Sequence, residues 1–230
     1  MSPLPRTIDF ASVLASTVHD MKNSLCMLIQ SAELIQQEGE LLSEPAKDEL
    51  ARLSYEANRL NSNLLQLLSL YRLERNQLPV QIDEYFLADV VEEVLLKNQY
   101  FAQQRQIEIC VEHSDNLRWF FDYDLIINLL NDALSNAMRY CQQRLLLSVS
   151  VNAAKLCIEV HDDGQGFPDF MLQHEQPDMN TPDLANNHTG LGIFFAKLIA
   201  NAHSNKGIHG SVTLSNGGRY GGGVFRLVLP

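Results

Sequence analysis

The sequence predicts an α+β protein, with an N-terminal helical hairpin followed by a C-terminal α/β sandwich. Two observations support this prediction. Up to about residue 71 the apolar residues follow one heptad spacing, and beyond Pro79 helical stretches mix with alternating strand patterns. This change of period predicts two domains, residues 1–78 and 79–230.

The first domain is predicted to consist of two helices joined by a turn. Apolar residues recur in alternating steps of four and three at Leu14, Val18, Met21, Leu25, Leu28, Ala32 and Ile35. Gly39 and Pro45 interrupt this pattern, because both residues disfavour a continuous helix. The spacing then returns at Leu50, Leu53, Ala57, Leu60, Leu64, Leu67 and Tyr71.

A two-helix hairpin leaves one side of its apolar seam uncovered. Burying one leucine contributes roughly 1.5–3 kcal/mol, so an open seam favours association. The simplest solution is a homodimer with two-fold symmetry, in which two hairpins form a four-helix bundle through residues 8–76. The alternative is a hairpin that packs on the rest of its own chain.

The second domain mixes helices with strands that are adjacent in sequence. Helices are predicted over residues 86–104 and 124–140 and from residue 190 onward, and strands over residues 106–113, 144–151, 155–162, 210–216 and 223–230. This order indicates helices layered on a mixed sheet. Residues 168–187 are polar and show no period, which is typical of a long functional loop.

Charge and cysteine content narrow the function classes. With 17 basic against 28 acidic residues the net charge is −11, which argues against nucleic acid and anionic membrane as partners. Proteins and small ligands remain as possible binding partners. The four cysteines are far apart and have no CxxC spacing, so we expect buried, reduced thiols in a cytoplasmic protein. No segment has the pattern of a membrane span or a signal peptide.

Two glycine-rich turns and one helix carry the predicted chemistry. "DDGQGF" follows a strand, and "HTGLGIFFAKLIA" opens a helix whose first N–H groups would suit an anion. In the predicted helix 124–140, Asp132 and Asn136 lie four residues apart and therefore on one helix face. A carboxylate and an amide in this arrangement would hold Mg²⁺, which takes few protein ligands and completes its shell with phosphates and water.

The order of five motifs resembles the sensor histidine kinases of two-component systems. The motifs are "VHDMKNSL", "DYDLIINLLNDALSNAMRY", "VHDDGQGF", "TGLGIFFAK" and "GGGVFRLVLP", and they extend over essentially the whole chain. The resemblance implies a dimerisation and histidine-phosphotransfer hairpin followed by an ATP-binding domain of the GHKL, or Bergerat, type. It also implies ATP and Mg²⁺ as cofactors.

The resemblance also implies individual roles. His19 matches the phosphoaccepting histidine, and Asp20 matches the acidic neighbour that takes its proton. Asp162 matches the residue that accepts from the adenine amino group, and Asn136 matches the magnesium ligand. The remaining positions that match the family's nucleotide-binding motifs are Asp132, Arg139, Tyr140, Gly164, Gly166, Thr189, Gly190, Leu191 and Gly192.

Asn23 completes the first motif. It follows His19 by four residues, about 5–6 Å along the same helix face. An acid after the histidine with an amide three residues further on resembles the family's phosphatase signature, in which the amide orients water against a phosphoaspartate. The alternative is that Asn23 is a solvated residue of the helix surface.

Three departures from the family pattern affect these assignments. Most such kinases have asparagine where this chain has Asp132, so Asp132 either shifts the balance toward hydrolysis or helps to hold magnesium. The family's phenylalanine-rich lid motif is not recognisable, although Phe167 and Phe170 would partly replace it. No sensor segment is recognisable either, so we expect input through a separate sensory or regulatory protein, the short N-terminus or segments outside this chain.

The sequence therefore predicts an ATP-dependent protein-histidine kinase. It would autophosphorylate His19, pass the phosphoryl group to an aspartate on the receiver domain of a response regulator, and also dephosphorylate that regulator. The first alternative is a phosphotransfer or scaffold homodimer without productive ATP use, which the intact glycine motifs disfavour. A serine-directed protein kinase of the same superfamily is a more distant alternative.

Overall fold

The computed structural model describes residues 10–37, 43, 45–47, 49–50, 52–54, 56–57, 60–61, 64, 80–114, 116–173 and 191–230. The chain divides into two compact units, Met1–Pro79 and Val80–Pro230.

The N-terminal unit contains the long helix α1, Phe10–Gln37. The described residues from 45 to 57, and those at 60, 61 and 64, are also helical, whereas Ser43 is not. The remainder of the predicted second helix, residues 65–71, lies outside the described residues.

Two heptad-spaced rows of apolar residues in α1 differ in burial. Val18 and Ala32 are buried and Leu25 is half-buried, and these residues repeat every seven positions. The second row is solvent-exposed and consists of Met21, Leu28 and Ile35. The second helical segment also leaves Leu53 and Leu60 half exposed. The N-terminal unit therefore presents apolar rows that the single chain does not cover.

The C-terminal unit combines a five-stranded sheet with helices. Its elements are β1 (Asp83–Phe86), α3 (Leu87–Gln104), β2 (Glu108–Glu112), β3 (Arg118–Phe121), α4 (Tyr123–Tyr140), β4 (Arg144–Asn152), β5 (Lys155–Asp162), α5 (Asp169–Gln173), α6 (Leu191–Ala202), β6 (Ser204–Asn205), β7 (Ile208–His209), β8 (Ser211–Asn216) and β9 (Gly223–Leu229). The large sheet has the order β2-β4-β5-β9-β8. Only the β2–β4 pairing is parallel, so the predicted mixed sheet is confirmed.

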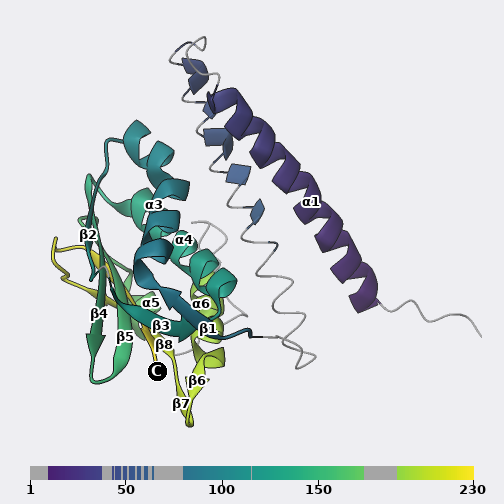
Figure 1. Cartoon of the computed structure of the whole chain (residues 1–230). Coiled ribbons are helices and arrows are strands. Elements are labelled where there is room, and N and C mark those ends of the chain that lie inside the picture. Colours follow the sequence, from purple (N-terminus) through teal and green to yellow (C-terminus); the bar gives the residue numbers. More distant parts are fainter. Residues whose placement is uncertain are drawn as a thin grey trace, which may run out of the picture. The chain divides into compact units, whose positions relative to one another are not determined.

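The hydrophobic core lies between this sheet and the helices α3, α4 and α6, which cover one of its faces (Figure 1). Alternation along the strands decides which side chains enter the core. In β5 the buried residues are Leu156, Ile158 and Val160, and Asp162 is next in the same alternation. The strand therefore places a carboxylate at its end, on the helix-covered side of the sheet.

Three features of this unit differ from the sequence prediction. The two-stranded sheet of β1 and β3 and the hairpin of β6 and β7 were not predicted, because each strand is only two to four residues long. Residues Asp169–Gln173, predicted as part of a loop, form the short helix α5. The rest of that predicted loop, residues 174–187, lies outside the described residues.

The cysteines also differ in part from the prediction. All four are free thiols, but only Cys141 is buried, and Cys26, Cys110 and Cys157 are half-buried. Strand register explains the two in the sheet. Cys110 and Cys157 occupy the alternation positions opposite to the core residues of β2 and β5, so they lie on the face away from the helices.

Candidate functional site

Helix α4 is fixed at its N-terminus by Asp122. One carboxylate oxygen of Asp122, Oδ1, accepts a hydrogen bond from the backbone N–H of Leu125 at 3.0 Å and caps the helix. The other, Oδ2, accepts from the backbone N–H of Gln81 at 2.8 Å. Asp122 thus joins the start of α4 to the first residues of the C-terminal unit.

A buried histidine lies behind this cap. Nε2 of His203 accepts from the backbone N–H of Asp122 at 3.0 Å, and Nδ1 donates to the carbonyl of Ile199 at 2.7 Å. These partners require the neutral ring with its proton on Nδ1, because the amide can only donate and the carbonyl can only accept. Burial lowers the pKa of His203, although hydrogen bonding to Ile199 and the charge of Asp122 oppose this shift.

The stability of the C-terminal unit is expected to fall as the pH drops below about 6.5, the ordinary histidine pKa. In that range the unfolded chain takes up a proton at His203 that the folded chain does not, so the unfolded state gains stability. Urea unfolding followed by the fluorescence of Trp119, the single tryptophan, measures this slope. His203→Gln should flatten the slope between about pH 6.5 and 5.5, whereas the exposed-site control His209→Gln should keep it. An equally steep slope in both variants would contradict the assignment.

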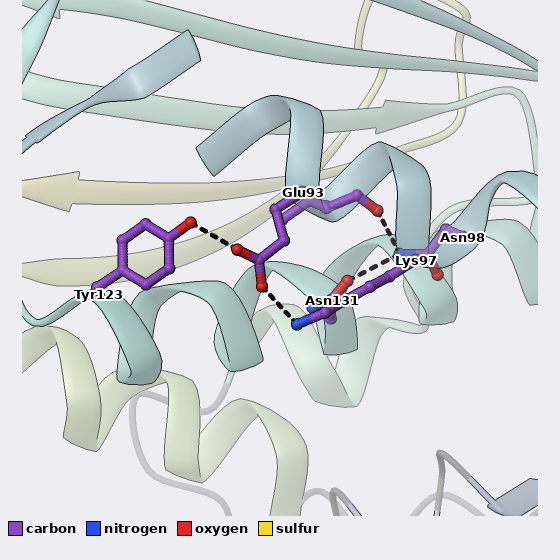
Figure 2. A network of polar contacts seen from close by, with 6 residues as sticks. Glu93, Lys97, Asn98, Tyr123 and Asn131 are labelled. Atoms are coloured by element: carbon purple, nitrogen blue, oxygen red, sulfur yellow. Dashed lines mark hydrogen bonds and ion pairs between the residues drawn. The ribbon is translucent and has the colours of Figure 1, made fainter. Parts of the chain in front are cut away.

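A polar network holds α4 against α3 (Figure 2). The hydroxyl of Tyr123 donates to Glu93 at 2.5 Å, and Lys97 donates to the other oxygen of Glu93 at 2.6 Å. Both bonds lower the pKa of Glu93, Lys97 having the larger effect, and the same carboxylate raises the pKa of Tyr123 to about 12. Next to Lys97 in α3, the amide of Asn98 donates to Asn131 of α4 at 2.8 Å. These contacts fix the rotation of α4 about its axis.

The polar side of α4 carries four of the predicted site residues. Asp132 and Arg139 are half-buried, and Asn136 and Tyr140 are exposed. Asp132 and Asn136 are one helical turn apart, as predicted from their spacing. The guanidinium carbon of Arg139 lies 5.9 Å from the centre of the Tyr140 ring. The helix therefore presents oxygen donors, a cation and an aromatic ring along one side.

Asp162 is buried, with 7% of its surface exposed, and it is held by backbone N–H groups from two segments. Its Oδ1 accepts from Gly164 at 2.8 Å and from Gly223 at 3.0 Å. Its carbonyl accepts from Gly222 at 3.1 Å. Both side-chain bonds end on Oδ1, so within the described part of the chain Oδ2 keeps its lone pairs for a donor outside the protein.

Glycine is required around this carboxylate for steric reasons. A Cβ at Gly222 would lie 2.3 Å from Oδ1 of Asp162, and one at Gly223 would lie 2.7 Å from Oδ2. At Gly164 a Cβ would lie 2.3 Å from the carbonyl oxygen of Tyr140, the last residue of α4. The turn after β5 therefore contacts the C-terminus of α4, and Asp162, Gly164 and Tyr140 come together in one place.

The remainder of the first glycine turn is fixed by Asn216. Gly166 has φ +80°, and a Cβ there would lie 2.6 Å from Oδ1 of Asn216. The Asn216 side chain accepts from the N–H of Phe167 at 2.7 Å and donates to its carbonyl at 2.8 Å. This pair of bonds ties the turn to the end of β8.

Asp163 connects the same turn to the chain that leaves α4. Its carboxylate accepts from the backbone N–H groups of Gln142 at 2.7 Å and Gln143 at 3.1 Å. Partial burial raises the pKa of Asp163, but bonds from the N–H groups of Arg144, Gln142 and Gln143 outweigh it and hold that pKa below its usual value. Two adjacent aspartates thus have different roles, since Asp163 is fully engaged by backbone donors and Asp162 is not.

The second glycine turn is described only in part. Thr189 and Gly190 lie outside the described residues. Leu191 is the first residue of α6, and the half-buried Gly192 follows it in the first turn. The predicted position of this turn at a helix N-terminus therefore agrees with the start of α6.

The three residues of the first motif lie in the N-terminal unit. His19, Asp20 and Asn23 are all within α1, and Asp20 and Asn23 are exposed. The side chain of His19 lies outside the described part of the structure. Asp20 and Asn23 are three positions apart in a continuous helix and therefore share one side of it.

Sequence reasoning missed several residues that build the site. The N–H groups of Gly222 and Gly223, the side chain of Asn216 and the backbone anchoring by Asp163 were not assigned. The run of three glycines at residues 221–223 was the one signal in the sequence for Gly222 and Gly223. Asn216 gave no signal, because its partner Phe167 is 49 residues away in the sequence.

The C-terminal part of the chain is similar to a known family of ATPases. Residues 121–230 match the family described as histidine kinase-, DNA gyrase B- and HSP90-like ATPase. These residues are similar to the ATPase domains of that family. All the nucleotide-site residues predicted from the sequence lie within this matched region, and His19, Asp20 and Asn23 lie outside it.

Curated relatives extend the similarity to nearly the whole chain. The sensor protein KdpD of Clostridium acetobutylicum is 25% identical over 227 residues, which cover 96% of this chain and 24% of KdpD. The sensor protein SrrB of Staphylococcus aureus is 24% identical over 198 residues, which cover 83% of this chain and 34% of SrrB. The chain thus spans about a quarter to a third of the length of these relatives. The resemblance to sensor histidine kinases is confirmed.

Solved structures share the fold. The Acinetobacter baumannii histidine kinase AdeS has a TM-score of 0.60 at 20% identity, and the match covers 92% of this chain and 96% of AdeS. Full-length ShkA, solved in complex with AMPPNP, has a TM-score of 0.62 at 18% identity and covers 96% of this chain and 46% of its own. Within the described part of this chain, no helix is long and apolar enough to cross a membrane.

Proposed function

We propose that the chain is an ATP-dependent protein-histidine kinase that phosphorylates His19. The observation that carries this proposal is the carboxylate of Asp162, whose Oδ1 accepts from two backbone donors and whose Oδ2 accepts no hydrogen bond from the described residues. A carboxylate accepts but cannot donate, so it suits the exocyclic amine of adenine. Incubation with γ-labelled ATP and magnesium, followed by acid treatment of the label, tests the proposal.

The residues of α4 fit a magnesium ion that arrives with a nucleotide. Asn136 and Asp132 would hold it, since one offers an exposed amide and the other a half-buried carboxylate one turn away. Among the described residues, no group of three or more His, Cys, Asp or Glu side chains would hold a metal by itself. That agrees with an ion bound partly through phosphates. Bound magnesium would neutralise charge on the phosphoryl group in transfer.

Phosphoryl transfer needs alignment and charge neutralisation more than covalent assistance. Arg139 and Tyr140 would lie beside the nucleotide, and Thr189, Gly190, Leu191 and Gly192 would cover its phosphates at the N-terminus of α6. In the other unit, the unprotonated nitrogen of the neutral His19 ring would attack the γ-phosphorus of ATP as ADP leaves, and Asp20 would accept the proton of the other ring nitrogen. The phosphoryl group would then pass to an aspartate on a response regulator receiver domain.

The N-terminal unit supports a homodimer. The exposed row of Met21, Leu28 and Ile35 repeats every seven residues, as does the exposed pair Leu53 and Leu60. Heptad-spaced apolar rows on two helical segments suit a four-helix bundle with a second copy. A separate sensory or regulatory protein would supply the signal.

The double variant Leu28→Glu with Leu60→Glu is expected to abolish dimerisation. Each leucine contributes roughly 1.5–3 kcal/mol when buried, and a buried unpaired carboxylate reverses that contribution. Analytical ultracentrifugation should show a wild-type dimer and a variant monomer at micromolar concentration. The control Gln30→Glu with Arg52→Glu, at exposed polar positions of the same segments, should remain dimeric. A wild-type monomer would contradict the bundle.

We also propose that the protein dephosphorylates its regulator through Asn23. The exposed Asn23 amide, three residues after Asp20 on one side of α1, would hold a water molecule in line with a phosphoaspartate. Water is a competent nucleophile toward an acyl phosphate once it is oriented, so position is the whole contribution required.

Asn23→Ala is expected to slow dephosphorylation of the regulator by about tenfold or more, the scale of one positioned interaction. Labelling of His19 should stay near wild type, because water is not a reactant in that step. Loss of label from a phosphorylated regulator measures the rate, with Gln30→Ala on the exposed surface of α1 as the control. Equal rates for wild type and Asn23→Ala would show that the protein is a kinase only.

The alternative function is a phosphotransfer or scaffold homodimer that does not use ATP productively. Such a protein would not need a buried carboxylate whose Oδ2 accepts no hydrogen bond from the described residues. The arrangement of Asp162 therefore favours the kinase.

A further inference from the structure

The loop between β8 and β9, residues 217–222, forms a closed turn. The N–H of Gly221 donates to the carbonyl of Gly218 at 2.9 Å, and the N–H of Gly217 donates to the carbonyl of Gly222 at 2.9 Å. Gly217 and Gly221 have φ +82° and +88°, backbone values that residues with a side chain rarely adopt. The turn therefore has a defined conformation and presents Arg219 and Tyr220 at its tip.

One end of this loop holds the candidate adenine-binding carboxylate. Gly222 donates to the carbonyl of Asp162 at 3.1 Å, and Gly223 donates to its Oδ1 at 3.0 Å. The second of these is one of only two hydrogen bonds that orient the Asp162 side chain in the described structure. The direction of Oδ2 thus depends on where the loop ends.

The tip of the loop is anchored on the opposite face of the sheet. The N–H of Arg219 donates to Nδ1 of His161 at 3.4 Å, and its guanidinium lies 3.5 Å from the carboxylate of Glu112 on β2. The Cys110 thiol, also on β2, raises the pKa of the Tyr220 hydroxyl. In register, Cys110 and His161 both flank Leu146 of β4, so the tip reaches across three strands.

Arg144 joins this anchor to the turn after β5. Its guanidinium carbon lies 4.9 Å from the centre of the Tyr220 ring, within cation–π range. Its Nε lies 3.8 Å from the carboxylate of Asp163, which holds the backbone of Gln142 and Gln143 after α4. Tyr220 is therefore connected to Asp162 in two ways. It belongs to the loop that donates to Asp162, and through Arg144 it is linked to the adjacent Asp163.

We propose that Tyr220 and Arg219 are positioning residues for recognition of the nucleotide base, because they anchor the loop whose N–H groups orient Asp162. The inference rests on the proposed ATP binding and extends it to residues on the far face of the sheet. Neither residue touches the ligand. When the anchor is removed, the carboxylate loses its fixed direction, and the preference for the adenine amino group declines.

The test compares the dissociation constants of ATP and inosine triphosphate, which has a carbonyl in place of the adenine amine. Wild type should bind ATP more tightly. Tyr220→Ala should lower the ratio of the two constants by about fivefold, through weaker ATP binding, as expected when a bond to a charged group is partly lost. Tyr220→Phe keeps the ring under Arg144 and should stay within about twofold of wild type.

A general loss of stability would weaken the binding of both nucleotides and leave the ratio of their dissociation constants unchanged. The matched control is Phe86→Ala, which removes a similar arginine–aromatic contact, Arg118 at 4.0 Å, elsewhere in the domain and should not change the ratio. If Tyr220→Ala does not fold, Tyr220→Leu is measured in the same way. A wild-type ratio in the folded variant overturns the positioning role. A wild-type protein that does not distinguish the two nucleotides overturns adenine recognition by Asp162 itself.

Discussion

Asp162→Asn is expected to lower ATP affinity by about a hundredfold while the protein stays folded, since a charged hydrogen bond is replaced by a clash of donors. The Oδ1 position must accept from Gly164 and Gly223, so the amide oxygen of asparagine will take that place. The NH₂ group then occupies the position of Oδ2 and faces the adenine amine, donor against donor.

Titration calorimetry with ATP and magnesium measures this loss, and thermal unfolding shows whether the fold survives. Asp124→Asn is the matched control, because it removes one carboxylate from an exposed position at the start of α4. It should leave ATP affinity within about twofold of wild type, as expected for an exposed charge. Unchanged affinity in a folded Asp162→Asn protein would remove adenine recognition from this residue.

His19→Gln is expected to abolish phosphorylation completely and to leave ATP affinity unchanged. Glutamine keeps the helix of α1 but has no nucleophilic nitrogen, and His19 lies outside the residues that match the ATPase family. Labelling with γ-labelled ATP measures the first effect and calorimetry the second. Asn23→Ala, four residues along the same helix, is the control that should still take label. A labelled His19→Gln protein would show that another residue accepts the phosphoryl group.

The elements with a strong period were predictable from the sequence. Helix α4 and strands β4, β5 and β9 match their predicted ranges to within one or two residues, because each buries one clear row of apolar side chains. Asp162 was predictable for the same reason. It follows a strand whose alternation is regular, and a glycine turn follows it.

The parts that were not predicted depend on contacts between distant residues. His203 lies outside the motifs recognised in the sequence, yet it accepts a hydrogen bond from the backbone of Asp122, 81 residues away. Gly223 orients Asp162 from 61 residues away. β1 pairs with β3 across an intervening helix and strand, so no hairpin signal marks either strand. Local periodicity carries no information about such pairings.

The most direct test of the account is the chemical stability of the label that the wild-type protein takes from γ-labelled ATP with magnesium. A histidine kinase gives a phosphorus–nitrogen bond, which acid hydrolyses and base leaves intact. We therefore expect a label on the wild-type chain that is lost in acid and retained in base. An acid-stable label would indicate a serine-directed kinase, and the absence of label in a protein that binds ATP would indicate a scaffold. Either result would contradict the assignment as a protein-histidine kinase.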